Sequence, residues 1–164
     1  MRRGIIPFGV ILCIGCADDS TGPARMPDLN GQWTYSATNV RAPGDSGGVT
    51  CNVSGLTLSI TQAGDLLSGT YSGGTVRCSD GTSFPVARDG YSTLTGSLVW
   101  DSEWDDFALV GLILDQPYDW GHQGTVSGSS MGGRMSIYGP EFCDEWGCRE
   151  ELLASGDWMA TRVK

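Results

Sequence analysis

The sequence predicts an all-β fold, an up-and-down antiparallel barrel of about eight strands. Glycine is very frequent, with 25 of the 164 residues. Short stretches in which apolar and polar residues alternate are separated by Gly, Asp, Ser and Asn, whereas almost no segment has helical periodicity. Joining each strand to the next along the chain is the simplest topology for such a pattern, and closing the sheet removes its edges.

The alternation defines the expected strands in order. Leu56, Leu58 and Ile60 alternate with threonines and serines, which predicts a strand with one apolar and one polar face. The same reasoning gives strands at residues 32–40, 53–62, 66–78, 84–88, 93–100, 106–114, 121–129, 131–138 and 156–163. A short helical turn is expected at residues 150–154, before the last strand. Glycines such as Gly69 and Gly96 follow an apolar residue by two positions within strands, which predicts close backbone approach or sharp coiling there.

The segment 106–114 is apolar on both faces. Phe107, Leu109 and Ile113 share one face, and the residues between them are also apolar. Such a strand is expected to be covered on both sides, by another part of the chain or by a protein partner.

The first residues resemble a bacterial lipoprotein signal. Arg2 and Arg3 precede an apolar run of about ten residues, too short to cross a bilayer. The stretch from Leu12 to Cys16 resembles the lipobox, with Gly15 before the cysteine and Cys13 where leucine is usual. The resemblance implies that residues 1–15 are a cleaved signal peptide and that Cys16 is lipidated. An ordinary signal peptide cut further on, near Ala17 or Ala24, is the alternative.

Lipidation implies a location for the protein. Two or more acyl chains anchor a protein stably, so the mature chain would be attached to a membrane without spanning it. Residues 16–27 are expected to be the lipidated cysteine and a flexible tether, and residues 28–164 the barrel domain. Ala17 after the lipidated cysteine is compatible with the outer membrane, facing the periplasm or the exterior, in the cell envelope.

The charge excludes some partners. The whole chain has a formal net charge of −9. Arg2 and Arg3 would leave with the signal, so eight cationic residues would remain against nineteen acidic ones, a net charge of −11. Because phosphate binding needs clustered positive charge, nucleic acid is not an expected partner.

Four cysteines remain after the signal and the lipidated residue, and they are expected to form disulfides. An exported domain lies in an oxidising compartment, and four cysteines allow three connectivities. The spacing favours Cys51 with Cys78 and Cys143 with Cys148, although sequence alone does not fix the pairing. A zinc site would need closer pairs than these.

Two short motifs resemble calycin families. Gly31-Gln32-Trp33 is similar to the Gly-x-Trp motif at the head of the first lipocalin strand, and Gly69-Thr70-Tyr71 is similar to a strand segment of avidin-like barrels. The resemblance implies an eight-stranded barrel with a ligand cavity at its mouth. It also implies that Trp33 closes the barrel floor beneath an arginine near the last strand, for which Arg162 is the candidate.

No catalytic or metal-binding motif is present. His122, the one histidine, is expected near a strand end or in a loop, without the sequence context of a Ser-His-Asp triad. Acidic residues gather in segments such as 101–106, where solvated carboxylates are expected and a calcium site or a hydrolase pair is the alternative. We therefore expect no enzyme activity, no metal and no cofactor.

The expected function is binding of one small apolar or amphipathic ligand inside the barrel. Barrels of eight strands are either filled by their own side chains or wide enough for one small ligand. The alternative is a filled structural barrel that contacts a protein in the envelope through residues 106–114 and loop tryptophans. The candidate ligand contacts are the apolar strand residues Trp33, Leu58, Ile60, Tyr71, Leu98, Trp100, Leu109 and Trp120.

Overall fold

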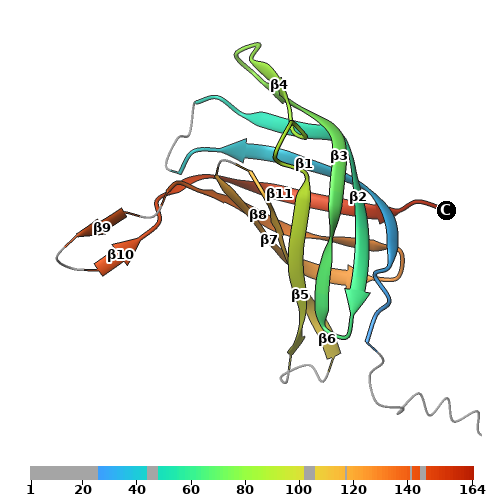
Figure 1. The fold of residues 1–164 in the computed structure, drawn as a ribbon. Coiled ribbons are helices and arrows are strands. Elements are labelled where there is room, and N and C mark those ends of the chain that lie inside the picture. The colour runs from blue at the N-terminus through green and yellow to red at the C-terminus, as the bar shows by residue number, and fades with distance from the viewer. Residues whose placement is uncertain (1–25, 44–47, 102–105, 117, 141, 145–146) are drawn as a thin grey trace, which may run out of the picture.

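A closed antiparallel barrel of eight strands forms the body of the protein in the computed structural model (Figure 1). The structure describes residues 26–43, 48–101, 106–116, 118–140, 142–144 and 147–164, and the side chains there except those of residues 100–101, 106–109, 142–144 and 147–149. The barrel strands are β1 (Gly31–Arg41), β2 (Cys51–Ala63), β3 (Leu66–Cys78), β5 (Thr93–Asp101), β6 (Asp106–Leu114), β7 (Asp119–Ser127), β8 (Ser130–Tyr138) and β11 (Leu152–Arg162).

Each barrel strand pairs with the next one along the chain, and β11 pairs with β1 to close the sheet. The long strand β3 has two neighbours on one side. Its first half pairs with β5, and its second half pairs with the short strand β4 (Ser83–Pro85). The predicted all-β, up-and-down barrel is therefore confirmed.

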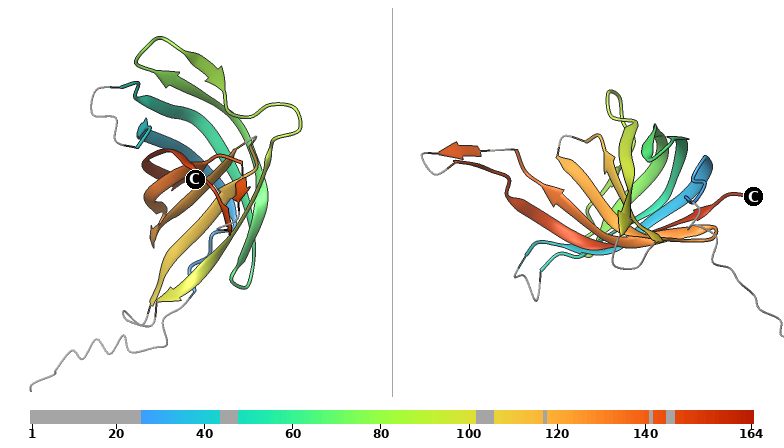
Figure 2. Two further views of the ribbon diagram at one scale, coloured as in Figure 1. Left: turned by 90° about the vertical axis from the view of Figure 1, so that its left-hand side faces the viewer. Right: turned by 90° about the horizontal axis from the view of Figure 1, so that it is seen from below.

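The connection between β8 and β11 differs from the prediction. Two short antiparallel strands, β9 (Phe142–Asp144) and β10 (Gly147–Arg149), pair with each other and project away from the barrel (Figures 1 and 2). The helical turn expected at residues 150–154 is wrong, because β11 already begins at Leu152. Leu152 pairs with Tyr138 and Ala154 with Ile137, with a register shift between them, so sheet pairing outweighs the local helical preference. Within the described residues, no helix is long and apolar enough to cross a bilayer.

One of the two expected disulfides is confirmed. Cys51 and Cys78 lie directly opposite each other on β2 and β3 and are bonded, with an S–S distance of 2.05 Å. Cys143 and Cys148 are paired residues of the β9–β10 hairpin, but their side chains lie outside those described. Their bond stays a prediction that the strand register favours.

The core fills most of the barrel interior. The inward residues of the alternating strands are buried as predicted, for example Leu56, Leu58 and Ile60 on β2. Strand β6 shows the same alternation, with Val110, Leu112 and Leu114 buried. Ile113, between two of them, is 48% exposed, so the expected cover on both faces is wrong at this position, whereas Phe107 and Leu109 lie outside the described side chains.

The two ends of the barrel differ. One end has the tight turns at residues 64–65 and 128–129 and receives both the first and the last described residues of the chain (Figure 1). The other end has the longer connections, at residues 42–50, 79–92, 115–118 and 139–151. We call the first end the floor and the second end the mouth.

The floor is closed by the contact that the lipocalin resemblance implies. The Arg162 guanidinium lies 4.8 Å from the centroid of the Trp33 ring, and the indole N–H of Trp33 donates a hydrogen bond to the Leu29 carbonyl at 3.0 Å. Arg162 also donates to the carbonyls of Asn30 and Asp28. Leu29 and Trp33 are fully buried, so the segment before β1 seals this end.

Arg162→Ala is expected to lower the free energy of unfolding by about 1–2 kcal/mol. The change removes a cation–π contact and hydrogen bonds that hold the segment before β1. Urea denaturation measures the effect. Arg77→Ala is the matched control, because Arg77 is exposed on β3, and its cost is expected to stay below about 0.5 kcal/mol. Equal losses for both variants would contradict a sealing role for Arg162.

Candidate ligand-binding site

An apolar cavity opens at the barrel mouth. Its volume is about 210 Å³, and it is lined from six barrel strands, from β4 and from the connection between β1 and β2. The lining is apolar except for Arg41 at the rim. Its members are Val40, Arg41, Ala42, Val49, Cys51, Val53, Val76, Phe84, Trp120, Met135, Ile137 and Ala154.

The strands position this lining by simple alternation. On β8, Met135 and Ile137 are two residues apart and therefore point to the same side of the sheet. Trp120 opposes Ile137 across the β7–β8 pair, and Ala154 opposes it across the β8–β11 pair. The cavity wall is thus built from in-register residues at the mouth ends of neighbouring strands.

Two apolar residues at the rim of the cavity are exposed. Val49 is 43% exposed and Phe84 is 38% exposed, although both line the cavity. A ligand that filled the cavity would cover these two side chains and gain the hydrophobic free energy of removing them from water.

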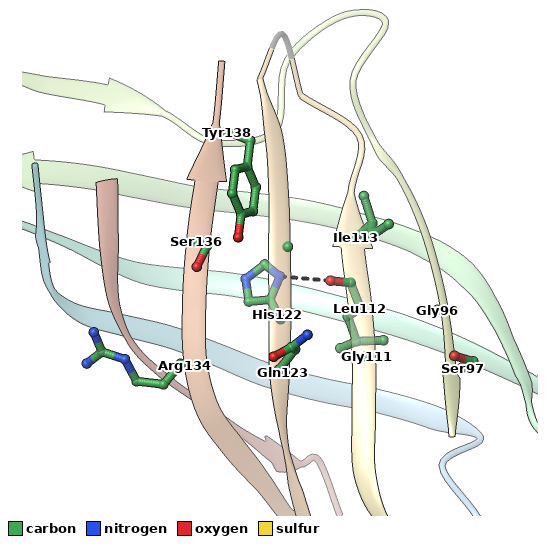
Figure 3. Close-up of a pocket in the computed structure, with 11 residues that line it drawn as sticks. Gly96, Ser97, Gly111, Leu112, Ile113, His122, Gln123, Arg134, Ser136 and Tyr138 are labelled. Atoms are coloured by element: carbon green, nitrogen blue, oxygen red, sulfur yellow. Dashed lines mark hydrogen bonds between the residues drawn. The ribbon is translucent and has the colours of Figure 1, made fainter. Parts of the chain in front are cut away.

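Buried polar groups lie beneath the cavity. Met135 lines the cavity, and its sulfur lies 3.6 Å from the Tyr35 hydroxyl. The same hydroxyl lies 2.8 Å from Nε2 of His122. Nδ1 of His122 lies 3.2 Å from the Leu112 carbonyl (Figure 3). These contacts fit a neutral imidazole that donates from Nδ1 and accepts at Nε2.

Burial controls the protonation of this pair. His122 is almost completely buried, and desolvation lowers its pKa from 6.5 to about 4. Desolvation also raises the pKa of the Tyr35 hydroxyl. Both groups are therefore neutral at pH 7, and the Trp158 ring packs 5.4 Å from the His122 ring centroid. The pair is enclosed and hydrogen-bonded, as in a structural polar contact within a core.

A second polar contact closes another side of the interior. The Gln116 amide donates hydrogen bonds to the Tyr71 hydroxyl and, at 3.1 Å, to the Val86 carbonyl. The Tyr71 hydroxyl in turn donates to the Asp115 carbonyl, and desolvation raises its pKa. Gln116 thus ties β3 to the connection between β6 and β7.

The predicted ligand contacts occupy different parts of the barrel. Trp120 lines the mouth cavity. Leu58, Ile60 and Leu98 are buried core residues outside the cavity lining, Trp33 closes the floor, and Tyr71 belongs to the Gln116 contact. The side chains of Trp100 and Leu109 lie outside those described, as do Trp104 and Trp146, the other loop tryptophans.

Sequence reasoning missed most of the cavity wall and the position of His122. Met135 and Ile137 alternate in a predicted strand, but the pattern does not say which end of the barrel stays open. His122 was expected at a strand end or in a loop, and it lies inside the barrel in β7. Its two-residue spacing from Trp120 was the available signal for an inward position.

Groups that could hold a metal ion are absent from the described part of the chain. The acidic segment 101–106 falls largely outside that part. Within the described residues, then, the site offers an apolar surface and one cation at its rim.

Comparison with known proteins gives no match: no family model, no curated protein and no solved structure matches the chain.

Proposed function

We propose that the protein is a lipid-anchored, non-enzymatic lipoprotein of the cell envelope whose barrel mouth binds a small apolar ligand or the apolar part of an amphipathic one. The single observation that carries the proposal is the cavity of about 210 Å³ with an almost wholly apolar lining. A dry apolar cavity of about 150 Å³ is large enough for benzene in another protein, so this volume suits one ring or the end of an acyl chain. Drug-sized ligands need larger sites.

The cavity favours ligand binding over the filled structural barrel. Side chains fill the floor and the middle of the barrel, but among the described residues a cavity remains at the mouth. The side chains that line an empty apolar cavity lack the van der Waals contacts that a ligand would supply.

The position of the floor agrees with a membrane anchor. The segment that would connect to Cys16 reaches the barrel at the floor, which is the end opposite the mouth. A tether attached there would leave the mouth unobstructed by the attachment point. The Cys51–Cys78 disulfide is also compatible with an oxidising compartment such as the periplasm.

Native mass spectrometry of the full chain, purified from a bacterial envelope in detergent, tests the ligand. We expect a non-covalent adduct that is absent after denaturation and absent from the detergent alone. A protein that carries only detergent, and takes up no apolar compound from an envelope extract, would contradict the binding function.

Filling the mouth is expected to remove that adduct. Ala154→Leu places a larger side chain in the cavity wall, so the affinity for the ligand is expected to fall at least about tenfold, equivalent to about 1.4 kcal/mol. Ala63→Leu is the matched control, since Ala63 is exposed at the floor end of β2, and its adduct should persist. If the Ala154→Leu variant retained the ligand, the ligand would have to bind outside the mouth cavity.

The anchor has a separate test. We expect the mature full-length protein to carry a lipid mass on Cys16 and to partition with detergent, and Cys16→Ala to lose both properties. Mass spectrometry of the N-terminal peptide and phase separation measure them. An unmodified N-terminus at Ala17 or beyond would instead indicate an ordinary signal peptide.

A further inference from the structure

A second cavity lies on the outer face of the barrel. It has a volume of about 310 Å³ and spans strands β5 to β8. Most of its lining residues stand at outward positions of these strands, and the lining also includes Leu112 and His122, whose side chains are buried inside the barrel. Ile113, for example, stands between the buried Leu112 and Leu114. This outer groove is therefore separate from the mouth cavity, and strands β7 and β8 lie between the two.

Two glycines keep the groove open. A Cβ atom built on Gly111 or Gly121 would meet no atom closer than 3.9 Å, and neither residue has a positive φ. Neither glycine is therefore needed for a close backbone approach or a special turn. The contrast is clear at Gly96 and Gly133, where a Cβ would lie about 2 Å from a backbone oxygen. What Gly111 and Gly121 provide is empty space above the sheet.

The walls of the groove combine apolar and polar groups (Figure 3). Ile113 and the Tyr138 ring supply apolar surface, and the ring lies 3.9 Å from the Cβ position of Gly121. Ser97, Ser136 and Gln123 supply hydroxyl and amide groups that both donate and accept hydrogen bonds. An aromatic wall opposite such groups suits a ligand with an apolar face and a hydroxylated edge.

The charge at the groove favours a neutral ligand. Arg134 is the one charged residue of the lining, and its guanidinium already binds the Asp157 carboxylate at 2.7 Å. The hydrogen bond from Arg134 holds the pKa of Asp157 below its usual value, so the acid is ionised at neutral pH. Because the two charges of this pair neutralise each other and the chain has a net charge of −9, an anionic ligand would gain little electrostatic binding free energy in the groove.

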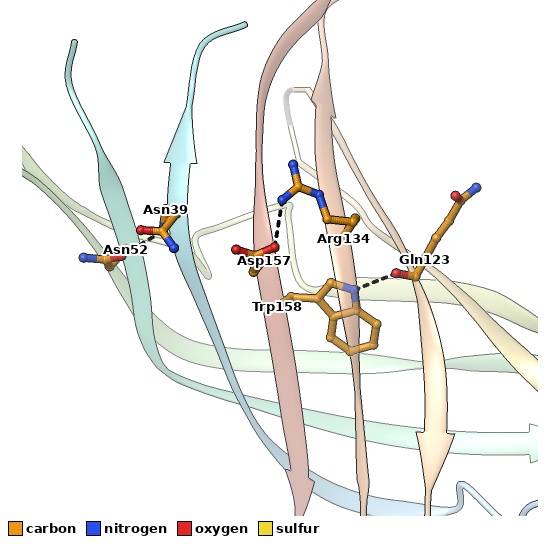
Figure 4. Close-up of polar contacts among 6 residues, drawn as sticks. All are labelled: Asn39, Asn52, Gln123, Arg134, Asp157 and Trp158. Carbon is orange, nitrogen blue, oxygen red and sulfur yellow. Dashed lines mark hydrogen bonds and ion pairs between the residues drawn. The ribbon is translucent and has the colours of Figure 1, made fainter. Parts of the chain in front are cut away.

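A row of polar side chains leads away from the groove (Figure 4). Gln123, Arg134 and Asp157 are consecutive partners across β7, β8 and β11. The row continues through Asn39 on β1 to Asn52 on β2, whose amide oxygen accepts from the Asn39 backbone N–H at 3.2 Å. At about 4.8 Å between strands, the four steps span on the order of 19 Å, which is longer than one sugar ring.

We propose that the outer groove binds a neutral carbohydrate chain, with one pyranose ring over Gly111 and Gly121. The C–H face of the ring packs on Tyr138 and Ile113, and its hydroxyls bond to Ser97, Ser136 and Gln123. Further rings lie along the row that begins at Arg134 and Asp157. Neighbouring hydroxyls of a sugar ring can form paired hydrogen bonds with the planar amide, guanidinium and carboxylate groups of this row.

NMR of the full chain, in a detergent without a sugar head group, tests the proposal with three neutral probes: cellotetraose, maltotetraose and chitotetraose. We expect saturable amide shifts at Gly111, Gly121 and Gln123 with at least one probe, and weaker binding of its monosaccharide. No saturable shift with any probe would overturn the proposal. Shifts at these amides that depend on protein concentration without sugar would also overturn it, because they would identify a contact between copies of the chain.

Variants separate the groove from the rest of the surface. Gly121→Leu fills the groove and is expected to weaken binding at least tenfold, whereas Thr125→Leu, on the same face of β7 outside the groove, is expected to leave it unchanged. Gln123→Ala removes an amide without filling space, so it tests the site even if Gly121→Leu folds poorly, and a loss of binding is expected. Unchanged affinity in Gly121→Leu or in Gln123→Ala would overturn the assignment.

Discussion

Gly96→Ala is expected to lower the free energy of unfolding by about 4 kcal/mol. The new Cβ would lie 2.1 Å from the Gly111 carbonyl oxygen and 2.9 Å from Cδ2 of Leu112. The first neighbour is a backbone atom of the paired strand β6, so β5 and β6 must separate where Gly96 opposes Leu112. Such a shift disturbs both ladder hydrogen bonds and the core, and losses of this size are exceptional for one methyl group.

The neighbouring glycine on β6 provides the control. Gly111→Ala meets no atom closer than 3.9 Å and needs no positive φ. Because alanine loses less backbone entropy on folding, this variant is expected to be as stable as the parent or more stable by about 0.5–1 kcal/mol. Urea denaturation of the two variants measures the difference. Similar losses for both would contradict the close approach of β5 and β6 at Gly96.

The two glycines show what a sequence pattern predicts and what it does not. Gly69 and Gly96 each follow an apolar residue by two positions, and the structure confirms that a side chain at either position would collide with the backbone of a paired strand. Gly128, from the same repeat, instead has φ +58° in the β7–β8 turn. Gly111 also follows an apolar residue by two positions. The open space at Gly111, however, depends on its register with Gln123 of β7 and Ser97 of β5.

The fold was predictable because each strand and turn is a local pattern. Local patterns identified a segment of every barrel strand, and the Gly-x-Trp resemblance identified the Trp33–Arg162 contact at the floor. The mouth was not predictable in the same way. Its wall combines the ends of strands far apart in the chain, such as Val40 and Ala154, and only the register of the closed barrel brings them together.

His122 illustrates the same limit. A single histidine between glycine and glutamine resembles a surface residue, and its hydrogen-bond partner, Tyr35, is 87 positions away in the sequence. An imidazole is readily buried only as its neutral form, which requires partners for both nitrogens. Those partners, the Tyr35 hydroxyl and the Leu112 carbonyl, become visible only when β1, β6 and β7 are placed around one interior.

The stability of the barrel is expected to fall by about 3 kcal/mol as the pH is lowered from 6.5 to 4. His122 has a pKa of about 4 in the folded protein, against about 6.5 when it is exposed in the unfolded chain. Between these values the unfolded chain binds a proton that the folded protein does not. The stabilisation is therefore fully present above pH 6.5, is lost as the pH falls towards 4, and does not change further below that.

Urea denaturation across this range, compared with His122→Gln, isolates the histidine. Glutamine is uncharged and keeps an acceptor near the Tyr35 hydroxyl, so the variant is expected to be less stable at pH 7 but to lose less stability between pH 6.5 and 4. Carboxylates whose pKa is lowered in the fold, such as those of Asp80 and Asp157, add their own loss at acid pH. That loss is common to both proteins, so the difference between the two curves reports His122. Parallel curves would contradict the prediction, because they would mean that the folded protein takes up the proton on His122. The enclosed Tyr35–His122 contact would then have to open to solvent beneath the mouth cavity.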